Sequence, residues 1–303
     1  MPRSHPPTLI TLVARTLREE CGVGRGSRVL LALSGGGDSM ALLHVLALLR
    51  KKQGFSLVAH GVDHGLRDAA CAELDLAEAA CIELGVGFSR SVLALEDGGN
   101  LQARARDARR LALTRAAAET EAALIATAHH ADDRAETVLL RLLRGAGPRG
   151  LAVLPPRTGV WIRPQCRARK ADISAHLARH RRAFSEDPSN LARRFLRTRV
   201  RSELLPLLEQ LSPQVVGHLC ALADALEQGL EPHEHERETE AALNDEHGVA
   251  LLLNRAQRLM VGRARSLGQR SAKVSLPHGR ELSLDPVTLR PRIAAAPPRP
   301  RKR

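Results

Sequence analysis

The sequence predicts an α/β fold with a parallel sheet, followed by a mainly helical region. Over the first 165 or so of the 303 residues, short apolar runs of strand length alternate with segments of helix length, and a glycine-rich loop follows the first run. Such alternation is typical of βαβ units, whose parallel strands hold ligands beyond their carboxyl ends. After this region the strand pattern stops. Helical patterns continue to about residue 246, and a hairpin is expected around 277–279.

The expected elements follow one another in order along the chain. A leading helix over 9–20 carries its apolar side chains on one face, and the first strand follows over 28–33. Further strands are expected at 56–60, 88–92 and 124–128, alternating with helices at 70–84, 100–121 and 132–143. The loops 34–39, 60–67 and 127–136 should therefore meet in one crevice at the carboxyl ends of the strands.

The domain boundaries are predicted from the same change of pattern. Residues 1–210 are expected to form the first domain, with an α/β core over 28–165 and a helical extension over 166–210. A second, mainly helical domain is expected over 211–292. The Pro- and Arg-rich segment 293–303 is expected to be a basic, disordered tail.

Charge is distributed unevenly along the chain. Lys and Arg number 46 against 33 Asp and Glu, a net charge of +13. The net charge is −1 over 1–140, +11 over 141–210, −8 over 211–253 and +11 over 254–303. We therefore expect a polyanionic partner to contact the middle and the end of the chain. With four Phe, one Trp and no Tyr, the composition excludes an aromatic platform that stacks RNA bases.

The lengths of the apolar runs and the spacing of the cysteines narrow the class of protein further. No uncharged apolar stretch approaches the ~20 residues of a membrane helix, and we identify no signal peptide. The five cysteines form no CxxC pair and no zinc-ligand spacing, which favours free thiols and a cytoplasmic protein. The sequence leaves the oligomeric state open, with a homodimer as one option.

The glycine-rich loop is the main chemical signal. It consists of Ser34, Gly35, Gly36, Gly37, Asp38 and Ser39. Glycines let the backbone approach a phosphate group closely, and N–H groups at the start of a helix bind anions. The two hydroxyls can donate to phosphate oxygens, and Asp38 is suited to Mg²⁺. The loop is neither a Walker A sequence nor a GxGxxG dinucleotide motif.

A second group of polar residues follows the strand expected at 124–128. Asp133 and Glu136 are three residues apart, so they share one face of the expected helix. Paired carboxylates there could bind a cationic ligand or a metal. His129 is the better candidate for a proton acceptor than His130, and histidine titrates near neutral pH.

These motifs resemble those of a known family. SGGGDS between an apolar strand and a helix resembles the pyrophosphate-binding loop of the N-type ATP pyrophosphatases, which have a Rossmann-like, adenine nucleotide alpha hydrolase-like fold. Further segments occur in the order seen in the tRNA(Ile)-lysidine synthetases: AHGVDHGLR at 59–67, AHHADDRAET at 128–137, RGAGPRGL at 144–151, IRP at 162–164 and DPSN at 187–190. The resemblance covers roughly residues 28–210.

The resemblance implies a specific ligase reaction. ATP with Mg²⁺ would adenylate the C2 carbonyl oxygen of the wobble cytidine in a CAU anticodon of tRNA(Ile). The ε-amine of free L-lysine would then displace AMP to give lysidine, which changes codon specificity from AUG to AUA. Residues 1–210 would catalyse this reaction, and residues 211–292 would bind the tRNA.

The resemblance also implies roles for individual residues. The expected catalytic residues are Asp38, His129, Asp133, Glu136 and Arg199. ATP would contact the whole 34–39 loop together with His64 and Arg106, and Asp38 would hold Mg²⁺. Lysine would bind to Asp133 and Glu136, and tRNA to Arg144, Arg197 and Arg201. Among the alternating arginines 197, 199 and 201, Arg199 is the first choice to neutralise phosphate charge in the reaction.

Two alternatives stay open from the sequence. One is another enzyme of the superfamily, a tRNA thiolase or an amidating synthetase, although thiolases of this fold use cysteine clusters or a catalytic cysteine and no cysteine lies near SGGGDS. The other is a non-catalytic RNA-binding relative. Such a protein would be expected to have lost Asp38 or the acidic pair, and both are intact.

Overall fold

The computed structural model describes residues 7–63, 69–93, 101–185 and 196–229, together with three strands further along the chain. The chain divides into two compact units, Met1–Gly229 and Leu230–Arg303. No helix in the described parts is long and apolar enough to cross a membrane.

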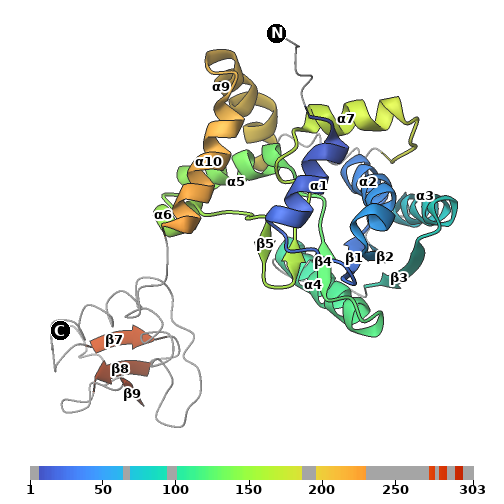
Figure 1. The fold of residues 1–303 in the computed structure, drawn as a ribbon. Coiled ribbons are helices and arrows are strands. Elements are labelled where there is room, and N and C mark those ends of the chain that lie inside the picture. The colour runs from blue at the N-terminus through green and yellow to red at the C-terminus, as the bar shows by residue number, and fades with distance from the viewer. Residues whose placement is uncertain are drawn as a thin grey trace, which may run out of the picture. The chain divides into compact units, whose positions relative to one another are not determined.

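A six-stranded sheet forms the centre of the first unit (Figure 1). Its strands are β1 Arg28–Ala32, β2 Ser56–Asp63, β3 Gly87–Val92, β4 Leu124–Ala126, β5 Arg157–Thr158 and β6 Trp161–Ile162. They lie in the order β3-β2-β1-β4-β6-β5, and all neighbours are parallel except the β5–β6 pair. The predicted α/β class with a parallel sheet is confirmed.

Helices cover both faces of this sheet. The helices of the unit are α1 Leu9–Glu19, α2 Gly37–Gln53, α3 Ala69–Leu84, α4 Leu101–Glu119, α5 Ala131–Leu143, α6 Pro148–Leu151, α7 Lys170–Arg179, α8 Leu196–Arg199, the π-helical turn Val200–Leu204, α9 Leu205–Leu211 and α10 Val215–Gln228. Buried side chains of α1, α2, α3 and α7 share one hydrophobic core on one face, whereas those of α4 form the core on the other. Figure 1 shows α4 set apart from α2 and α3 in this way.

Strand β1 illustrates why the sequence forms a central strand. Val29 and Leu31 join the core beneath α1 and α2, while Leu30 and Ala32 join the core beneath α4. Successive side chains of a strand point to opposite faces, so a strand covered on both sides must be apolar throughout. The strand therefore delivers the glycine-rich loop from the middle of the sheet.

The strand order places two loops at one position. β1 pairs with β2 on one side and β4 on the other, so the order reverses at this point. Ligands of open parallel sheets bind where this reversal occurs, beyond the carboxyl ends of the strands. Loop 33–36 after β1 and loop 127–130 after β4 flank that position.

Helix α10 belongs to the first unit and packs against α5 and α9. Its Val216 and Cys220 lie in a core with Ala135 and Leu139 of α5 and with Leu205 of α9. We expected residues 211–292 to form a separate, mainly helical domain, but the boundary between the compact units follows Gly229. The apolar face of α10 accounts for this, because it is buried against α5.

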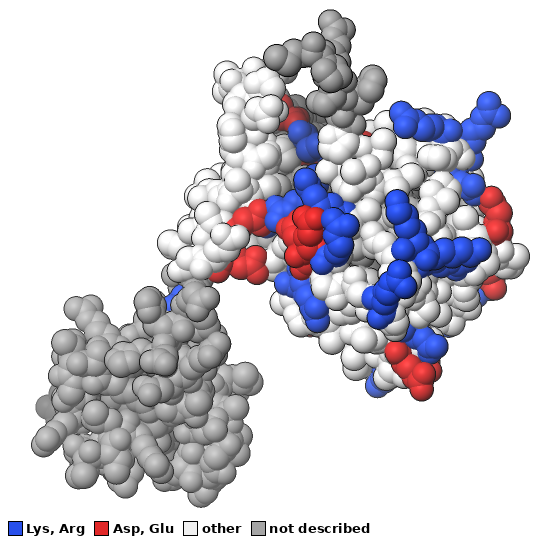
Figure 2. All heavy atoms as spheres, viewed as in Figure 1, with Lys and Arg blue, Asp and Glu red and all other residues white. Residues whose placement is uncertain are grey.

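Ion pairs connect the same helix to the rest of the unit. Arg167 pairs with Asp224 of α10 and with Glu20 beside α1. Asp224 also pairs with the fully buried Arg134 of α5, at 2.7 Å. Figure 2 shows acidic and basic side chains side by side between α10 and the body of the sheet. These pairs join segments that are far apart in sequence.

The described residues of the second unit are strands. β7 Lys273–Leu276, β8 Arg280–Leu284 and β9 Pro291–Ala295 form an antiparallel sheet in that order. Leu276 pairs with Arg280, so the hairpin predicted around 277–279 is confirmed. The expected disordered tail at 293–303 begins within β9, and its residues 296–303 lie outside the described part.

Candidate active site

The glycine-rich loop has a fixed internal geometry. The Ser39 hydroxyl donates to the Gly36 carbonyl at 2.9 Å and lies 3.2 Å from the Ser34 hydroxyl. Gly35 has φ +79°, and a Cβ there would lie 2.3 Å from the Glu73 carbonyl oxygen. Glycine at position 35 is therefore required by the fold itself.

Gly36 differs from Gly35, because nothing in the described structure crowds it. It is the N-cap of α2, with φ −73°, and the nearest atom to a Cβ there would be the Ser34 hydroxyl oxygen at 3.7 Å. The side of Gly36 where a Cβ would stand is thus open, at the N-terminus of a 17-residue helix, and we call this open space the phosphate cradle. Backbone N–H groups and the helix dipole at such a terminus favour an anion such as a phosphate group.

Asp38 lies in the first turn of α2 and faces a cation. Its Oδ1 atom is 2.5 Å from the ammonium nitrogen of Lys170, the first residue of α7. Lys170 was not predicted from the sequence, in which it is 132 positions from Asp38. The one feature of the sequence that could have pointed to Lys170 is its position at the start of a helix in a basic segment.

His130 lies among three carboxylates. Its Nε2 atom is 3.8 Å from Asp38 and 3.5 Å from Asp133, and its Nδ1 atom is 3.5 Å from Asp132. Burial disfavours the charged ring, but these carboxylates outweigh burial and raise the pKa of His130 above its usual value. His130 therefore joins the α2 and α5 sides of the site.

The acidic pair is held by two arginines. Glu136 is 1% exposed, and Arg201 approaches its two carboxylate oxygens at 2.5 and 3.0 Å. Arg197 lies 3.3 Å from Glu136 and 3.6 Å from Asp133, and Arg201 lies 3.3 Å from Asp133. The site thus combines two carboxylates with two guanidinium groups.

Arg199 is the one of the three expected arginines that the structure does not bring to the acidic pair. Its guanidinium pairs with Glu203 at 3.2 Å, and its side chain is 61% exposed. Positions 197 and 201 are four apart and share a helix face, whereas 199 lies on the other side. The helical geometry of this segment explains the difference.

The surroundings of His129 favour its neutral form. Its Nδ1 atom lies 3.0 Å from the Thr127 hydroxyl, which orients the ring. Burial lowers the pKa of His129 to about 4, and nearby Arg163 and Arg109 act in the same direction. The imidazole can therefore accept a proton at pH 7, although a low pKa makes it a weak base.

The remaining expected site residues are more dispersed. Arg106 is exposed on α4, while Arg109 of the same helix lies near enough to His129 to affect its pKa. Arg144 is exposed at the C-cap of α5. His64 lies outside the described residues.

His60 and Gly61 have structural explanations within β2. The two ring nitrogens of His60 lie 2.8 and 3.0 Å from the hydroxyls of Ser89 and Ser91 on β3, and burial lowers the pKa of this histidine. A Cβ at Gly61 would lie 2.6 Å from Leu74 of α3. Gly61 thus lets α3 pack closely on the sheet.

Four of the five cysteines are buried, and Cys71 of α3 is exposed. All five are unpaired. Burial raises the pKa of Cys21 to about 11 and of Cys81 and Cys166 to about 12. Because the thiolate is the reactive form, these buried thiols are inert.

Comparisons with known proteins agree with this geometry. The model of the PP-loop domain family matches residues 10–208. The tRNA(Ile)-lysidine synthase of Ralstonia nicotianae is 41% identical over 206 residues, which cover 64% of this chain and 43% of that protein. The tRNA(Ile)-lysidine synthase of Thermobifida fusca is 36% identical over 228 residues, which cover 74% of this chain and 70% of that protein.

A solved structure shares the fold. The U34-tRNA thiolase NcsA from Methanococcus maripaludis aligns with a TM-score of 0.62 at 21% identity, covering 74% of this chain and 80% of that chain. At this identity the likeness concerns the fold alone. The chain spans about half the length of most of the lysidine synthase relatives that it matches.

Proposed function

Because the chain belongs to the PP-loop family of the tRNA(Ile)-lysidine synthases, we propose that it ligates free lysine to a tRNA cytidine at the expense of ATP. The substrate tRNA would be tRNA(Ile) with a CAU anticodon. The reaction would adenylate C2 of the wobble cytidine, release pyrophosphate, and then replace AMP by the ε-amine of lysine. It would act in the cytoplasm.

One observation carries this proposal. An uncrowded phosphate cradle at Gly36 lies at the same sheet position as an acidic pair that is bracketed by arginines. Asp38 and His130 connect the two, since His130 Nε2 lies within 3.8 Å of both Asp38 and Asp133. ATP and an amino acid can thus be bound within one crevice.

The ATP side follows from the chemistry of the loop. The α2 N-terminus and the Ser34 and Ser39 hydroxyls would bind the pyrophosphate part of ATP. Asp38 would hold Mg²⁺, because carboxylate oxygens are the ligands that this ion prefers, and Mg²⁺ would neutralise phosphate charge. Lys170, 2.5 Å from Asp38, would turn toward the phosphates when the metal occupies that carboxylate.

The lysine side follows from the paired charges. Asp133 and Glu136 would bind an ammonium group of lysine, and Arg197 and Arg201 are placed to bind its carboxylate. The ε-amine must lose a proton before it attacks. His129 would accept that proton, directly or through water.

The tRNA side rests on charge. Arg144 on its exposed loop and the strongly basic segments would contact phosphates of the tRNA. With so few aromatic side chains in the chain, the flipped cytidine would be held by backbone groups, arginines and hydroxyls.

The oligomeric state is a separate question. Light scattering of the purified chain distinguishes a monomer from a homodimer.

Release of pyrophosphate tests the proposal. The full chain is incubated with ATP, Mg²⁺ and a transcript of tRNA(Ile) that has a CAU anticodon. We expect release that depends on this tRNA and is lost in Asp38→Ala. Asp75→Ala, which removes an exposed partner of Arg90, is the matched control and should keep the activity. Release that is equal with a GAU anticodon would contradict the proposal.

A further inference from the structure

Three histidines gather between α2 and α7, outside the site described above. His44 lies in the middle of α2, His176 in the last turn of α7, and His180 at the C-cap of that helix. His176 and His180 are four residues apart, so they project from the same face. Two helices that are separate in sequence thus direct three imidazoles at one point.

The rings are close together and buried. The Nδ1 atom of His44 lies 2.9 Å from the Nε2 atom of His176. The His180 ring is tilted against both, with ring centroids 4.8 and 4.5 Å away. His44 and His176 are 4% and 6% exposed, and His180 is half-buried. One ligand nitrogen from each ring lies within 4.8 Å of the others.

This donor set fits a particular kind of ion. Imidazole nitrogens suit Zn²⁺ and its neighbours in the first transition row, and three histidines with an open position form a known zinc arrangement. With Zn–N bonds of about 2.0–2.1 Å, three tetrahedral ligand nitrogens lie roughly 3.3 Å apart. Small rotations of the side chains would bring the three nitrogens to that separation.

The surroundings of His44 and His176 favour the neutral ring, which is the form that binds a metal. Burial lowers the pKa of His44 and of His176 to about 4. Both rings are therefore neutral at pH 7, and no proton has to be expelled before an ion binds. The half-buried His180 is the third donor.

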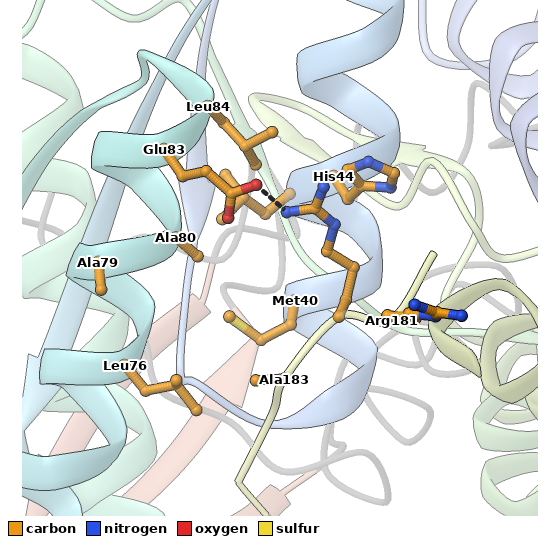
Figure 3. Close-up of a pocket in the computed structure, with 11 residues that line it drawn as sticks. Met40, His44, Leu76, Ala79, Ala80, Glu83, Leu84, Arg181 and Ala183 are labelled. Carbon is orange, nitrogen blue, oxygen red and sulfur yellow. Dashed lines mark hydrogen bonds and ion pairs between the residues drawn. The ribbon is translucent and has the colours of Figure 1, made fainter. Parts of the chain in front are cut away.

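A cavity borders the cluster at His44. The cavity has a volume of about 220 Å³ and is lined by His44, by apolar side chains such as Met40 and Leu76, and by Glu83 and Arg182. Figure 3 shows the His44 ring at its edge, near the ion pair that Glu83 forms with Arg182 at 2.6 Å. This ion pair balances the charge of Arg182, and the cavity has room for a water molecule on the His44 side of the cluster.

We propose that His44, His176 and His180 bind one divalent transition-metal ion of the zinc class. The ion would connect α2 and α7, and the first turns of these two helices hold the residues of the Asp38–Lys170 ion pair. Its role is therefore to fix the relative position of the two sides of the phosphate cradle. This role rests on the proposed function of the cradle, whereas binding of the ion by the three histidines does not depend on it, and the ion would not replace Mg²⁺ at Asp38.

The test measures binding of Zn²⁺ alone by the full chain. The protein is stripped with a chelator, dialysed against Zn²⁺ and analysed for bound metal. Wild type should bind one equivalent more than His176→Gln, while His218→Gln, which changes an exposed histidine of α10, should match wild type. At a hundredfold excess over Kd, Zn²⁺ should raise the Tm of wild type by about 5–10 °C more than that of His176→Gln.

A second variant keeps the test decisive if His176→Gln does not fold. His180→Gln removes the most accessible donor and should also lose the equivalent of metal. With Co²⁺ as a probe, wild type should show the d–d absorption of a four-coordinate ion, and His180→Gln should not. Equal metal content and equal spectra in wild type and this variant would show that the rings are only packed neutral side chains.

Discussion

At the scale of single residues, a substitution at Gly36 should impair ligand binding without impairing folding. Gly36→Ala places a methyl group where the nearest atom is 3.7 Å away, so the protein should accommodate it. Alanine is a weaker N-cap than glycine, which lowers the free energy of unfolding, and it makes the unfolded chain less flexible, which raises the free energy of unfolding. Because the two effects oppose each other, the free energy of unfolding should change by less than about 1 kcal/mol. We expect the Kd for ATP to rise at least about tenfold, because the methyl group enters the phosphate cradle. Equilibrium binding and urea unfolding measure the two effects.

Gly35→Ala is the comparison for that prediction. Its φ of +79° and the 2.3 Å approach of the Glu73 carbonyl make alanine strained there. We expect a loss of about 2 kcal/mol or more in the free energy of unfolding. If Gly36→Ala unfolds as easily as Gly35→Ala, or binds ATP as well as wild type, the cradle is misassigned.

Arg201 and Arg199 should differ in their effect on catalysis. Arg201→Ala removes the closest partner of the buried Glu136, so both the acidic pair and the lysine site should be disturbed. We expect kcat/KM for lysine to fall about 100-fold or more. Arg199→Ala removes an exposed partner of Glu203 and should change kcat/KM less than about threefold. A larger loss in Arg199→Ala than in Arg201→Ala would restore Arg199 as the catalytic arginine.

His129 should make the stability of the chain sensitive to acid. Burial lowers its folded-state pKa to about 4, below the ordinary value of 6.5, so the unfolded chain binds a proton first as pH falls. The contribution of neutral His129 is complete above about pH 6.5 and decreases as pH falls toward 4. Between about pH 7.5 and 5, the urea midpoint of His129→Asn should fall less than that of wild type. His218→Asn, on an exposed face, should follow wild type; the same pH dependence in both variants would contradict the prediction.

At the scale of elements, α10 is held by a buried charge. Arg134 of α5 is fully buried, and Asp224 of α10 pairs with it at 2.7 Å. Asp224→Asn leaves a buried guanidinium without its counter-ion, which should cost about 3–5 kcal/mol. For a unit of this size the Tm should fall by about 6–20 °C, measured by calorimetry. Glu203→Gln, in an exposed pair, should lower Tm by no more than about 2 °C. A similar loss of Tm in both variants would show that the buried pair stabilises the unit no more than the exposed pair does.

The elements also show what the sequence could predict. The alternation of strands and helices and the loop at 34–39 are local patterns, and the structure places them as expected. Lys170 could not be found this way, because its contact with Asp38 spans 132 positions and depends on how α7 packs on α2. The Asp224–Arg134 pair spans 90 positions, so the packing of α10 in the first unit could not be predicted from local sequence patterns either. Arg197 and Arg201 could have been paired from helical spacing, once the segment was known to be helical.

At the scale of the whole molecule, charge should govern binding of the tRNA. Residues 254–303 hold 13 basic and 2 acidic side chains. Removal of this segment should weaken binding of tRNA and make log K less dependent on log salt concentration, by about 0.7–0.9 for each phosphate that the segment neutralises. ATP binding by the first unit should persist. Filter binding over a range of salt concentrations measures this, and equal affinity and slope with and without the segment would contradict it.

The central claim is that ATP adenylates the cytidine, and lysine then displaces AMP from it, at one crevice between the loops after β1 and β4. Incorporation of radiolabelled lysine into a CAU-anticodon tRNA(Ile) transcript, with ATP and Mg²⁺, tests it most directly. We predict label in the tRNA at the wobble cytidine, one AMP and one pyrophosphate released for each lysine, and no incorporation by Asp38→Ala. Active, folded protein that releases pyrophosphate from ATP but transfers no lysine to this tRNA would contradict the account.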